Sequence, residues 1–300
     1  RFLLDQKPVQ NIMKSLLKPT GVFLNTIILS PKTSYYCGSI NTMNTLSNRW
    51  NLNGKRCVIT GASKGIGRAI AWEFLNLGAE VFIISRKEDE LQTVINEWKQ
   101  QNFKIDGVAA DVSKASERER IAQAIQEKWG GLDVLVNNAG TNIRKKTAEY
   151  SAEEYHFLMQ TNLDSAYHLC QLFYPLLQKS AQGNIISITS VAGLNHLRTG
   201  SVYGMTKAAL VQLSKNLACE WAADNIRVNA IAPWYIETPL AETVLQNPDF
   251  LQEVLNRTPI KKIGQPEDVA AAAAFLCMPA AAHITGQCLA VDGGFSVYGF

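Results

Sequence analysis

Two side chains in the stretch SVYGMTKAAL could work together in proton transfer: the phenol of Tyr203 and the ammonium of Lys207, four residues apart. Four residues is about one helical turn, so on a helix both side chains lie on the same face. A phenol with a pKa near ~10 is a poor base at neutral pH, but a nearby ammonium favours the phenolate and lowers that pKa. The spacing therefore predicts a general acid/base, although it also occurs on solvated helix faces.

A serine hydroxyl could complete this chemistry. Ser190 closes the apolar segment NIISITS, shortly before Tyr203 in the chain. At the end of a strand, its hydroxyl can form a hydrogen bond with a carbonyl or hydroxyl oxygen of a substrate, where charge develops during a reaction. The alternative for Ser190 is a cap at the end of a strand.

A glycine-rich turn predicts a nucleotide site. The segment TGASKGIGRAI has Gly61, Gly65 and Gly67 in a G-x-x-x-G-x-G spacing, between an apolar run and a helical pattern. Glycine at such a turn lets a pyrophosphate approach the backbone N–H groups at a helix N-terminus. The alternative is an ordinary turn between a strand and a helix.

The next apolar run indicates which dinucleotide is bound. It ends in ISRK, where NAD-selective folds usually place a carboxylate for the ribose 2′-hydroxyl. Glu80 lies at the opposite end of that run, whereas Ser85 and Arg86 lie at the expected end. Because a guanidinium binds a 2′-phosphate bidentately, Arg86 predicts NADP(H), with Lys64 as a second positive charge. The alternative is that Arg86 begins a solvated helix.

The elements that must position these residues alternate between apolar runs and amphipathic segments. Runs this apolar are typical of a parallel sheet covered on both faces. The pattern predicts one α/β domain over 49–300, a doubly wound parallel sheet flanked by helices (a Rossmann fold), which binds ligands beyond the carboxyl ends of its strands. The predicted strands are 56–60, 80–85, 105–111, 132–138, 184–190, 226–233 and 287–294. The predicted helices are 66–77, 88–101, 115–128, 153–178, 203–222, 240–256 and 267–277.

Composition narrows the function classes. Of the 29 basic and 26 acidic residues, five basic and one acidic residue lie in 1–42, so the remainder is close to neutral. This balance disfavours nucleic-acid binding. The six cysteines are scattered without a C-x-x-C pair, which predicts no metal site and suits a reducing compartment, here the cytoplasm. No apolar run approaches the ~20 residues of a membrane span, so no membrane partner is expected.

The N-terminal segment stands apart. Lysines followed by a short apolar run faintly resemble a signal or transit peptide, but the run is interrupted and no clear cleavage pattern follows. Met43 lies just before the first predicted strand. We expect residues 1–48 to be an extension without a role in the chemistry, and residues 1–42 to be dispensable.

Five motifs, in order along residues 50–300, together resemble the short-chain dehydrogenase/reductase family. They are TGxxxGxG at 60–67, Asp111, NNAG at 137–140, the Ser190–Tyr203–Lys207 set, and P-x-x-I-x-T at 233–238. The resemblance implies reversible reduction of a ketone by NADPH, with Tyr203 protonating the developing alkoxide. It also implies that Lys207 bonds the nicotinamide ribose, that Asn162 joins a proton relay through water, and that the chain forms a homodimer or homotetramer.

The resemblance assigns a role to each motif residue. The catalytic residues are Asn162, Ser190, Tyr203 and Lys207. The cofactor-binding residues are Gly61, Ser63, Lys64, Gly65, Ile66, Gly67, Ser85, Arg86, Asp111, Val112, Asn138, Ala139, Gly140, Tyr203, Lys207, Pro233, Ile236 and Thr238. Some have structural alternatives: Asp111 could cap the following helix, Asn162 could be a polar group within a helix, and Asn137 is expected to tie neighbouring strands.

Within the family, segments 217–240 and 279–300 look most like the tropinone-reductase branch. Trp234 could wall the pocket or pack away from it, and residues 237–263 are expected to form a lid. The expected pocket segments are 141–146, which contains Arg144, and 194–201, which contains His196 and Arg198. Because positive charge disfavours an ammonium substrate, we expect a small neutral or anionic carbonyl compound rather than tropinone.

Two rival functions share the cofactor motifs. A 3-oxoacyl-thioester reductase would use the same catalytic set, but its acidic carrier protein calls for a basic surface, which this near-neutral chain does not suggest. A non-catalytic NADP-binding sensor or scaffold would typically lack the tyrosine or the lysine, and both are present.

Overall fold

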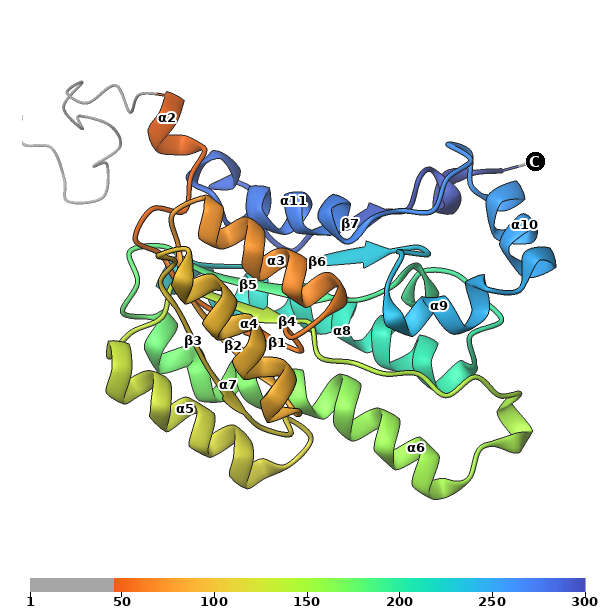
Figure 1. Cartoon of the computed structure of the whole chain (residues 1–300), viewed down its shortest axis with the longest axis horizontal. Helices are drawn as coiled ribbons and strands as arrows, with labels where there is room; N and C mark the ends of the chain where they lie inside the picture. Colours follow the sequence, from red (N-terminus) through yellow and green to blue (C-terminus); the bar gives the residue numbers. More distant parts are fainter. Residues whose placement is uncertain (1–45, 300) are drawn as a thin grey trace, which may run out of the picture. The chain divides into compact units, whose positions relative to one another are not determined.

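The computed structural model describes residues 46–299, and their centre is a seven-stranded sheet (Figure 1). All neighbouring strands pair in parallel, in the order β3-β2-β1-β4-β5-β6-β7. This doubly wound topology is the predicted one. The strands are β1 (Arg56–Thr60), β2 (Glu80–Ser85), β3 (Ile105–Ala109), β4 (Val134–Asn137), β5 (Gly183–Ile188), β6 (Ile226–Pro233) and β7 (Cys288–Val291).

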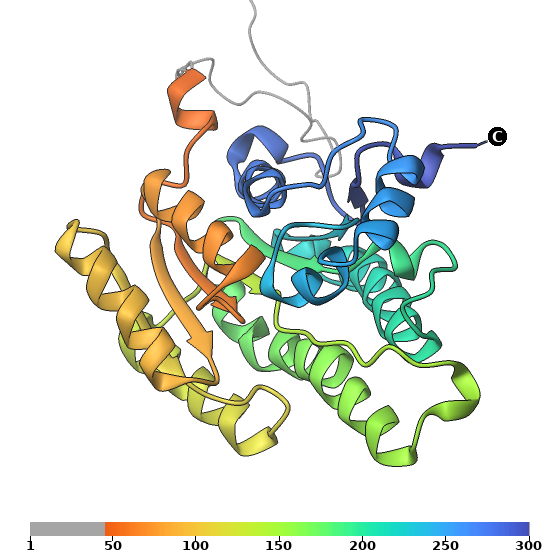
Figure 2. The same cartoon turned by 45° about the vertical axis from the view of Figure 1, so that its right-hand side comes forward.

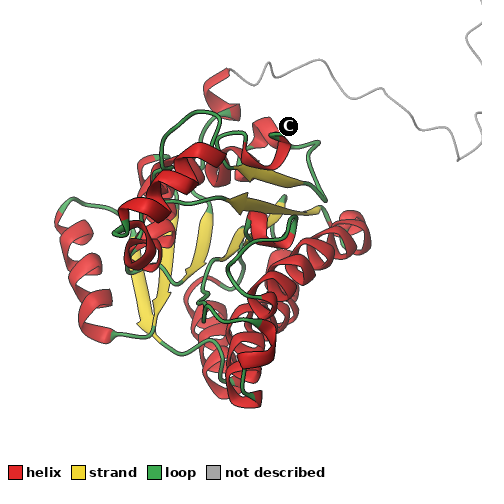
Figure 3. Ribbon diagram, turned by 90° about the vertical axis from the view of Figure 1, so that its right-hand side faces the viewer, coloured by secondary structure: helices red, strands yellow, loops and turns green. Residues whose placement is uncertain are grey.

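Helices cover both faces of the sheet, as Figure 3 shows, and this explains the continuously apolar strands. Every residue of β4, β5 and β6 is buried. One apolar core joins the sheet to α3 (Gly65–Asn76), α4 (Glu88–Gln100) and α11 (Pro266–Cys277). The other joins it to α5 (Ala115–Trp129), α7 (Ser165–Leu177) and α8 (Ser201–Glu220).

The predicted helix 153–178 is interrupted near its middle. It consists of α6 (Ala152–Met159), a π-helical turn over Gln160–Asp164, and α7. Such turns insert an extra residue into a helix and often occur at functional sites. This turn contains Asn162.

The prediction of one helix over 240–256 is wrong. The structure has two helices, α9 (Pro239–Leu245) and α10 (Pro248–Arg257). Pro248 has no N–H to continue α9, but it fits the first turn of α10. The side chain of Asn247 caps α10 by accepting hydrogen bonds from the N–H groups of Asp249 and Phe250. Figures 1 and 2 show α9 and α10, in blue, at the same end of the sheet as the loop before α6.

The predicted boundary at residues 48 and 49 falls inside the short helix α2 (Leu46–Arg49). The predictions for residues 1–42 lie outside the described residues, so the extension stays a prediction. The remaining short turns are η1 (Thr147–Glu149), η3 (Val191–Gly193), η4 (Ala222–Asp224), η5 (Pro279–Ala281) and η6 (Phe295–Val297).

The sequence predicts no disulfide scaffold, no metal site and no membrane span, and residues 46–299 bear on each of these. The five cysteines in this range are free thiols. Within the same residues, no group of histidine, cysteine or carboxylate side chains could hold a metal ion. None of the helices described is both long enough and apolar enough to cross a bilayer.

Candidate active site

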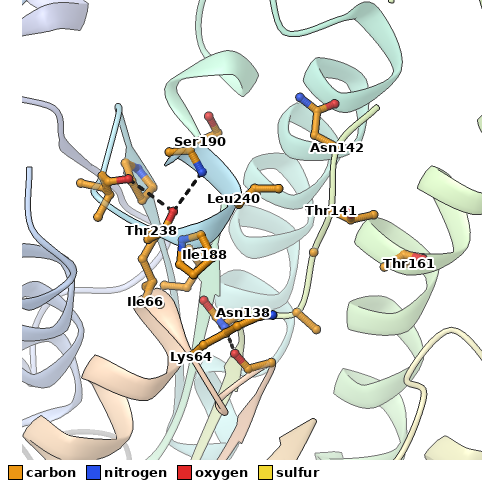
Figure 4. A pocket seen from close by; sticks show the side chains of 18 of the residues that line it. Lys64, Ile66, Asn138, Thr141, Asn142, Thr161, Ile188, Ser190, Thr238 and Leu240 are labelled. Atoms are coloured by element: carbon orange, nitrogen blue, oxygen red, sulfur yellow. Dashed lines mark hydrogen bonds between the residues drawn. The ribbon is translucent and has the colours of Figure 1, made fainter. Parts of the chain in front are cut away.

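The carboxyl ends of the central strands open into one cavity of about 320 Å³. The glycine turn after β1, the loops after β4 and β5, the start of α8 and the segment after β6 all line it. In Figure 4, Lys64 and Ile66 lie low in the view, whereas Ser190 and Asn142 lie near its top. The cavity therefore joins the predicted nucleotide turn to the predicted catalytic serine, at the edge where ligands bind in such sheets.

The glycine turn can accept a pyrophosphate only because its glycines lack side chains. Gly61 and Gly65 have φ of +66° and +57°, a left-handed conformation that favours glycine. A Cβ on Gly67 would lie 2.4 Å from both Asn138 Nδ2 and the carbonyl oxygen of Gly61. Lys64 precedes α3 without a side-chain cap, so the first N–H groups of α3 are free to bind an anion. These residues fit a dinucleotide.

Hydrogen bonds hold the loop after β4 against this turn. Asn138 Nδ2 donates to the carbonyl oxygens of Thr60 and Gly61, at 2.8 and 2.9 Å. Thr60 Oγ1 accepts from the N–H groups of Asn138 and Ala139, both at 3.0 Å. Asn138, Ala139 and Gly140 all line the cavity. Asn137 is buried, and its side chain donates to Cys170 Sγ of α7 at 3.3 Å, so the side chain bonds to a helix rather than to a neighbouring strand as expected.

The residues expected to recognise the adenosine ribose also line the cavity. Ser63 Oγ and Ser85 Oγ lie 2.8 Å apart, and Arg86 is exposed beside them. The sequence analysis missed a carboxylate here. Glu90, in the first turn of α4, lies 2.9 Å from Lys87 Nζ and 3.8 Å from Lys64 Nζ.

The hydrogen bond from Lys87 and the charge of Lys64 hold the pKa of Glu90 below its usual value. Glu90 is in the first turn of the helix that directly follows β2, so its place in the sequence could have put it near the ribose site at the end of that strand. A charged carboxylate therefore lies among the basic groups expected to bind a 2′-phosphate.

Three of the four predicted catalytic residues lie together in the lining of this cavity. Ser190, Tyr203 and Lys207 all line it. Ser190 Oγ accepts from the N–H of Ala192 at 3.1 Å, so the residue is both a cap and a cavity group. Lys207 is buried, and its ammonium donates to the carbonyl oxygen of Ile188 at 2.9 Å.

The expected effect of Lys207 on Tyr203 needs correction. Burial raises the pKa of the Tyr203 phenol, and a hydrogen bond with Ser190 and the charge of Arg144 only partly oppose this. Lys207 Nζ lies 5.6 Å from the centre of the Tyr203 ring, and burial lowers the pKa of Lys207 to about 8. The phenol is therefore held protonated, which suits a proton donor.

Asn162 is buried in the π-helical turn, and its amide is fixed by the loop after β4. Its Oδ1 accepts from the N–H of Thr141 at 2.8 Å, and its Nδ2 donates to the carbonyl oxygen of Thr141 at 2.9 Å. A Cβ on Gly140 would lie 3.4 Å from both Asn162 Oδ1 and Lys207 Nζ. Asn162 therefore lies close behind the cavity without lining it, and its role as a relay stays a prediction.

The remaining predicted cofactor residues are Asp111, Val112, Pro233, Ile236 and Thr238, and all of them line the cavity. Burial raises the pKa of Asp111, but hydrogen bonds from Ser113 outweigh it, so the pKa is lowered overall. Lys114, not Asp111, is the residue that precedes α5 as its N-cap. The alternative reading of Asp111 as the helix cap is therefore wrong.

The three basic residues proposed for the substrate end have different surroundings. Arg144 lines the cavity. Arg198 instead forms an ion pair with Glu253 of α10 and lies over the Phe250 ring. His196 is not among the cavity residues. Of these three residues, Arg144 alone lines the cavity and brings its positive charge to the substrate end.

Tyr235 lines the cavity at this end and was not predicted, whereas Thr199 was expected only as part of the pocket segment 194–201. Asn142 was expected only as part of a pocket segment. Trp234 lines the cavity, as the first of its two expected alternatives requires, and its ring also stacks on Phe295 with centroids 3.8 Å apart. Residues 238–241 line the cavity too, which places the start of the expected lid beside it.

Comparison with known proteins agrees with this geometry. A family model described as enoyl-(acyl carrier protein) reductase matches residues 61–296. A tropinone reductase homologue of Arabidopsis thaliana is 51% identical over 253 residues, covering 84% of this chain and 96% of the relative. A chloroplastic tropinone reductase homologue of the same plant is 49% identical, covering 85% and 80%.

Solved structures are similar over the same region. A gluconate 5-dehydrogenase from Burkholderia cenocepacia, in complex with NADP and tartrate, has a TM-score of 0.81 at 31% identity, covering 84% of this chain and 99% of the other. A 7α-hydroxysteroid dehydrogenase, complexed with NADH and 7-oxo glycochenodeoxycholic acid, has a TM-score of 0.79 at 37% identity, covering 83% and 96%.

Proposed function

The chain belongs to the short-chain dehydrogenase/reductase family, and we propose that it is an NADPH-dependent reductase that converts a small ketone reversibly to a secondary alcohol. One observation carries this proposal: Ser190, Tyr203 and Lys207 line the same cavity as the glycine turn and Arg86. A proton donor and a dinucleotide site in one cavity are what carbonyl reduction needs.

When NADPH is bound, its nicotinamide supplies a hydride to the carbonyl carbon. Ser190 and Tyr203 donate hydrogen bonds to the carbonyl oxygen, and Tyr203 gives its proton to that oxygen as negative charge develops there. Burial raises the pKa of Tyr203, which favours the protonated phenol as the donor.

We assign the return of the proton to Lys207 and Asn162. The buried ammonium of Lys207, whose pKa is lowered to about 8, can release a proton near neutral pH. Asn162 is held close to it by Thr141. Water would carry the proton between them and bulk solvent. Lys207 is also the residue we expect to hold the nicotinamide ribose.

NADP(H) is proposed over NAD(H) because Arg86 and Lys64 line the ribose end of the cavity. The fold alone does not decide this, since one similar structure holds NADP and another NADH. A guanidinium can bind a 2′-phosphate through two hydrogen bonds, an interaction that the 2′-hydroxyl of NAD does not offer.

We further propose a cytoplasmic homodimer or homotetramer, with residues 49–300 as the catalytic domain and 237–263 as a lid. Phe157, Tyr167 and Met205 are exposed on α6, α7 and α8, and helices with such side chains suit a subunit interface. Light scattering tests the assembly. Imaging of the full chain fused to a fluorescent protein tests the location, where a chloroplast signal would contradict it.

A panel of ketones tests the proposed function, with NADPH and NADH oxidation followed at the nicotinamide absorbance band. We expect turnover of small neutral or anionic ketones, with NADPH preferred and tropinone poor. Oxidation of neither cofactor with any ketone would contradict the proposal, and a strong preference for tropinone would overturn the expected substrate class.

A second candidate is an acyl-thioester reductase, because the matching family model is described as enoyl-(acyl carrier protein) reductase. The same panel should include 3-oxoacyl and enoyl thioesters. Turnover of these well above that of simple ketones would favour this candidate. NADPH binding without any turnover would instead favour a sensor or scaffold.

A further inference from the structure

The substrate end of the cavity contains polar atoms without partners. Within residues 46–299, seven buried side-chain polar atoms lack a hydrogen-bond partner. Three of them, Asn142 Oδ1, Arg144 Nε and Thr199 Oγ1, belong to residues that line this one cavity. Buried polar groups are usually paired, so a cluster of unpaired ones beside a cavity indicates a ligand that pairs with them.

Arg144 is the charged member of this cluster. Among the described residues it forms no ion pair, whereas Arg198 is paired with Glu253. Its side chain instead forms a hydrogen bond with Tyr235, and its charge lowers the pKa values of Tyr235 and Tyr203 against the effect of burial. Arg144 is therefore an uncompensated positive charge close to the catalytic phenol.

We propose that Arg144 binds an anionic group of the substrate, so that the preferred substrate is an oxo acid whose carboxylate pairs with Arg144 while its ketone faces Ser190 and Tyr203. This inference rests on the proposed function. The hydroxyl of Thr199 supplies a second donor to the carboxylate. Charge-assisted hydrogen bonds of this kind are roughly twice as strong as neutral ones.

The residues near Arg144 indicate which other groups this substrate carries. Asn142 Nδ2 already donates to the carbonyl oxygen of Thr199 at 3.1 Å, which leaves Asn142 Oδ1 as a free acceptor for a hydroxyl group. Leu197 and Trp234 line the cavity and offer apolar surface to a carbon skeleton. The substrate class is thus a small oxo acid, with or without a hydroxyl group.

Two ketones that differ mainly in charge test this inference: 4-oxocyclohexanecarboxylate and 4-oxocyclohexanecarboxamide, reduced with NADPH at pH 7. We expect the wild-type enzyme to prefer the carboxylate at least ~10-fold in kcat/KM. Arg144→Gln should lower kcat/KM for the carboxylate ~10- to 100-fold, mainly through KM, and should cost the amide at least ~10-fold less than the carboxylate. Arg144→Lys should restore part of the loss.

Arg198→Gln is the matched control, because it removes one positive charge near the same segment but outside the cavity lining. It should change both kcat/KM values less than ~2-fold, since exposed ion pairs contribute little. Equal use of the two ketones by the wild-type enzyme, or equal losses for both in Arg144→Gln, would overturn the inference and leave the proposed function standing.

A ligand that binds but cannot be reduced separates the proposed anion site from the proposed reductase function. Cyclohexanecarboxylate has no ketone, so calorimetry with the NADPH-loaded enzyme measures the anion site alone. We expect it to bind at least ~10-fold more tightly than cyclohexanecarboxamide, and to lose this advantage in Arg144→Gln. If no ketone is reduced but this pattern holds, the reductase function fails and the anion site stands. If Arg144→Gln still binds NADPH and keeps the advantage, the anion site is wrong.

Discussion

The two ends of the cavity differ in how their polar groups are paired. At the cofactor end, Asn138 is bonded to Thr60 and Gly61, and Lys64 lies beside Glu90. At the substrate end, Asn142, Arg144 and Thr199 each keep an unpaired buried atom. At the cofactor end these side chains are paired with other groups of the chain, whereas at the substrate end three buried polar atoms have no hydrogen-bond partner within it. We therefore expect cofactor binding to tolerate changes at the substrate end.

The largest expected effect concerns Tyr203, between the two ends. Tyr203→Phe removes the proton donor but keeps the ring, so ketone reduction should fall ~10²- to 10⁴-fold, the usual range for a general acid. NADPH binding, followed by fluorescence, should stay within ~3-fold. Tyr235→Phe is the matched control, since it removes the other phenol lining the cavity and should cost less than ~10-fold. Similar losses in both variants would contradict a special role for Tyr203.

Arg86→Gln tests the cofactor end. Loss of the guanidinium should weaken NADPH binding ~10- to 100-fold and leave NADH binding almost unchanged, because only NADPH has the 2′-phosphate. Arg120→Gln, an exposed arginine of α5 paired with Glu117, is the control and should affect neither cofactor. Fluorescence titration with NADPH and with NADH measures both affinities. Equal weakening for NADPH and NADH would refute the assigned role of Arg86.

The sequence predicts the residues of the cofactor end and the catalytic residues better than those of the substrate end. The glycine turn, Ser190 and the Tyr203–Lys207 pair depend on spacing within single strand–helix units, so the sequence places them correctly. Tyr235 was missed because it comes from a loop whose path depends on packing between distant segments, and Thr199 was expected only as part of a pocket segment. His196 and Arg198 were expected in the same way, but Arg198 turns to Glu253 of α10, a partner that spacing does not reveal.

Electrostatics were harder to predict than position. The pair Tyr203 and Lys207 suggested a lowered phenol pKa, but burial acts more strongly and raises it. Burial depends on the whole fold, since Lys207 of α8 lies against Ile188 of β5 and close to Gly140 after β4. The break between α9 and α10 could have been predicted, because Asn247 and Pro248 are a helix cap followed by a helix-starting proline.

Lys207 connects the two ends and should be costly to bury. Its pKa in the folded protein, about 8, is below the usual value, so below pH 8 folding must bury a charged ammonium. As the pH rises from about 8 towards 10.4, only the unfolded state keeps that proton, and the wild-type protein gains stability. Lys207→Met should therefore be more stable than wild type at pH 7, by about 1–2 kcal/mol, since the lost bond to Ile188 offsets part of the gain.

Urea unfolding at pH 7 and pH 9.5 measures this difference, which should shrink at the higher pH. Lys215→Met, on the exposed side of α8, is the control and should show no such dependence on pH. A wild-type protein more stable than Lys207→Met at pH 7 would show that the ammonium is better compensated than its surroundings indicate.

The smallest expected effect concerns Glu90, which lies among the basic groups of the cofactor end. Its carboxylate repels a 2′-phosphate, so Glu90→Gln should strengthen NADPH binding ~2- to 5-fold and leave NADH binding unchanged. Glu97→Gln, which removes an exposed carboxylate of α4 paired with Arg68, is the control. Weaker NADPH binding in Glu90→Gln would mean that Glu90 mainly positions Lys64 and Lys87.

The most direct test of the central claim follows the hydride itself. The enzyme reduces a small oxo acid with NADPH that carries two deuterium atoms at C4 of the nicotinamide, and mass spectrometry examines the alcohol. We expect one deuterium on the carbon that bore the ketone. An alcohol without deuterium, or no alcohol at all from any ketone of the panel, would contradict hydride transfer in this cavity.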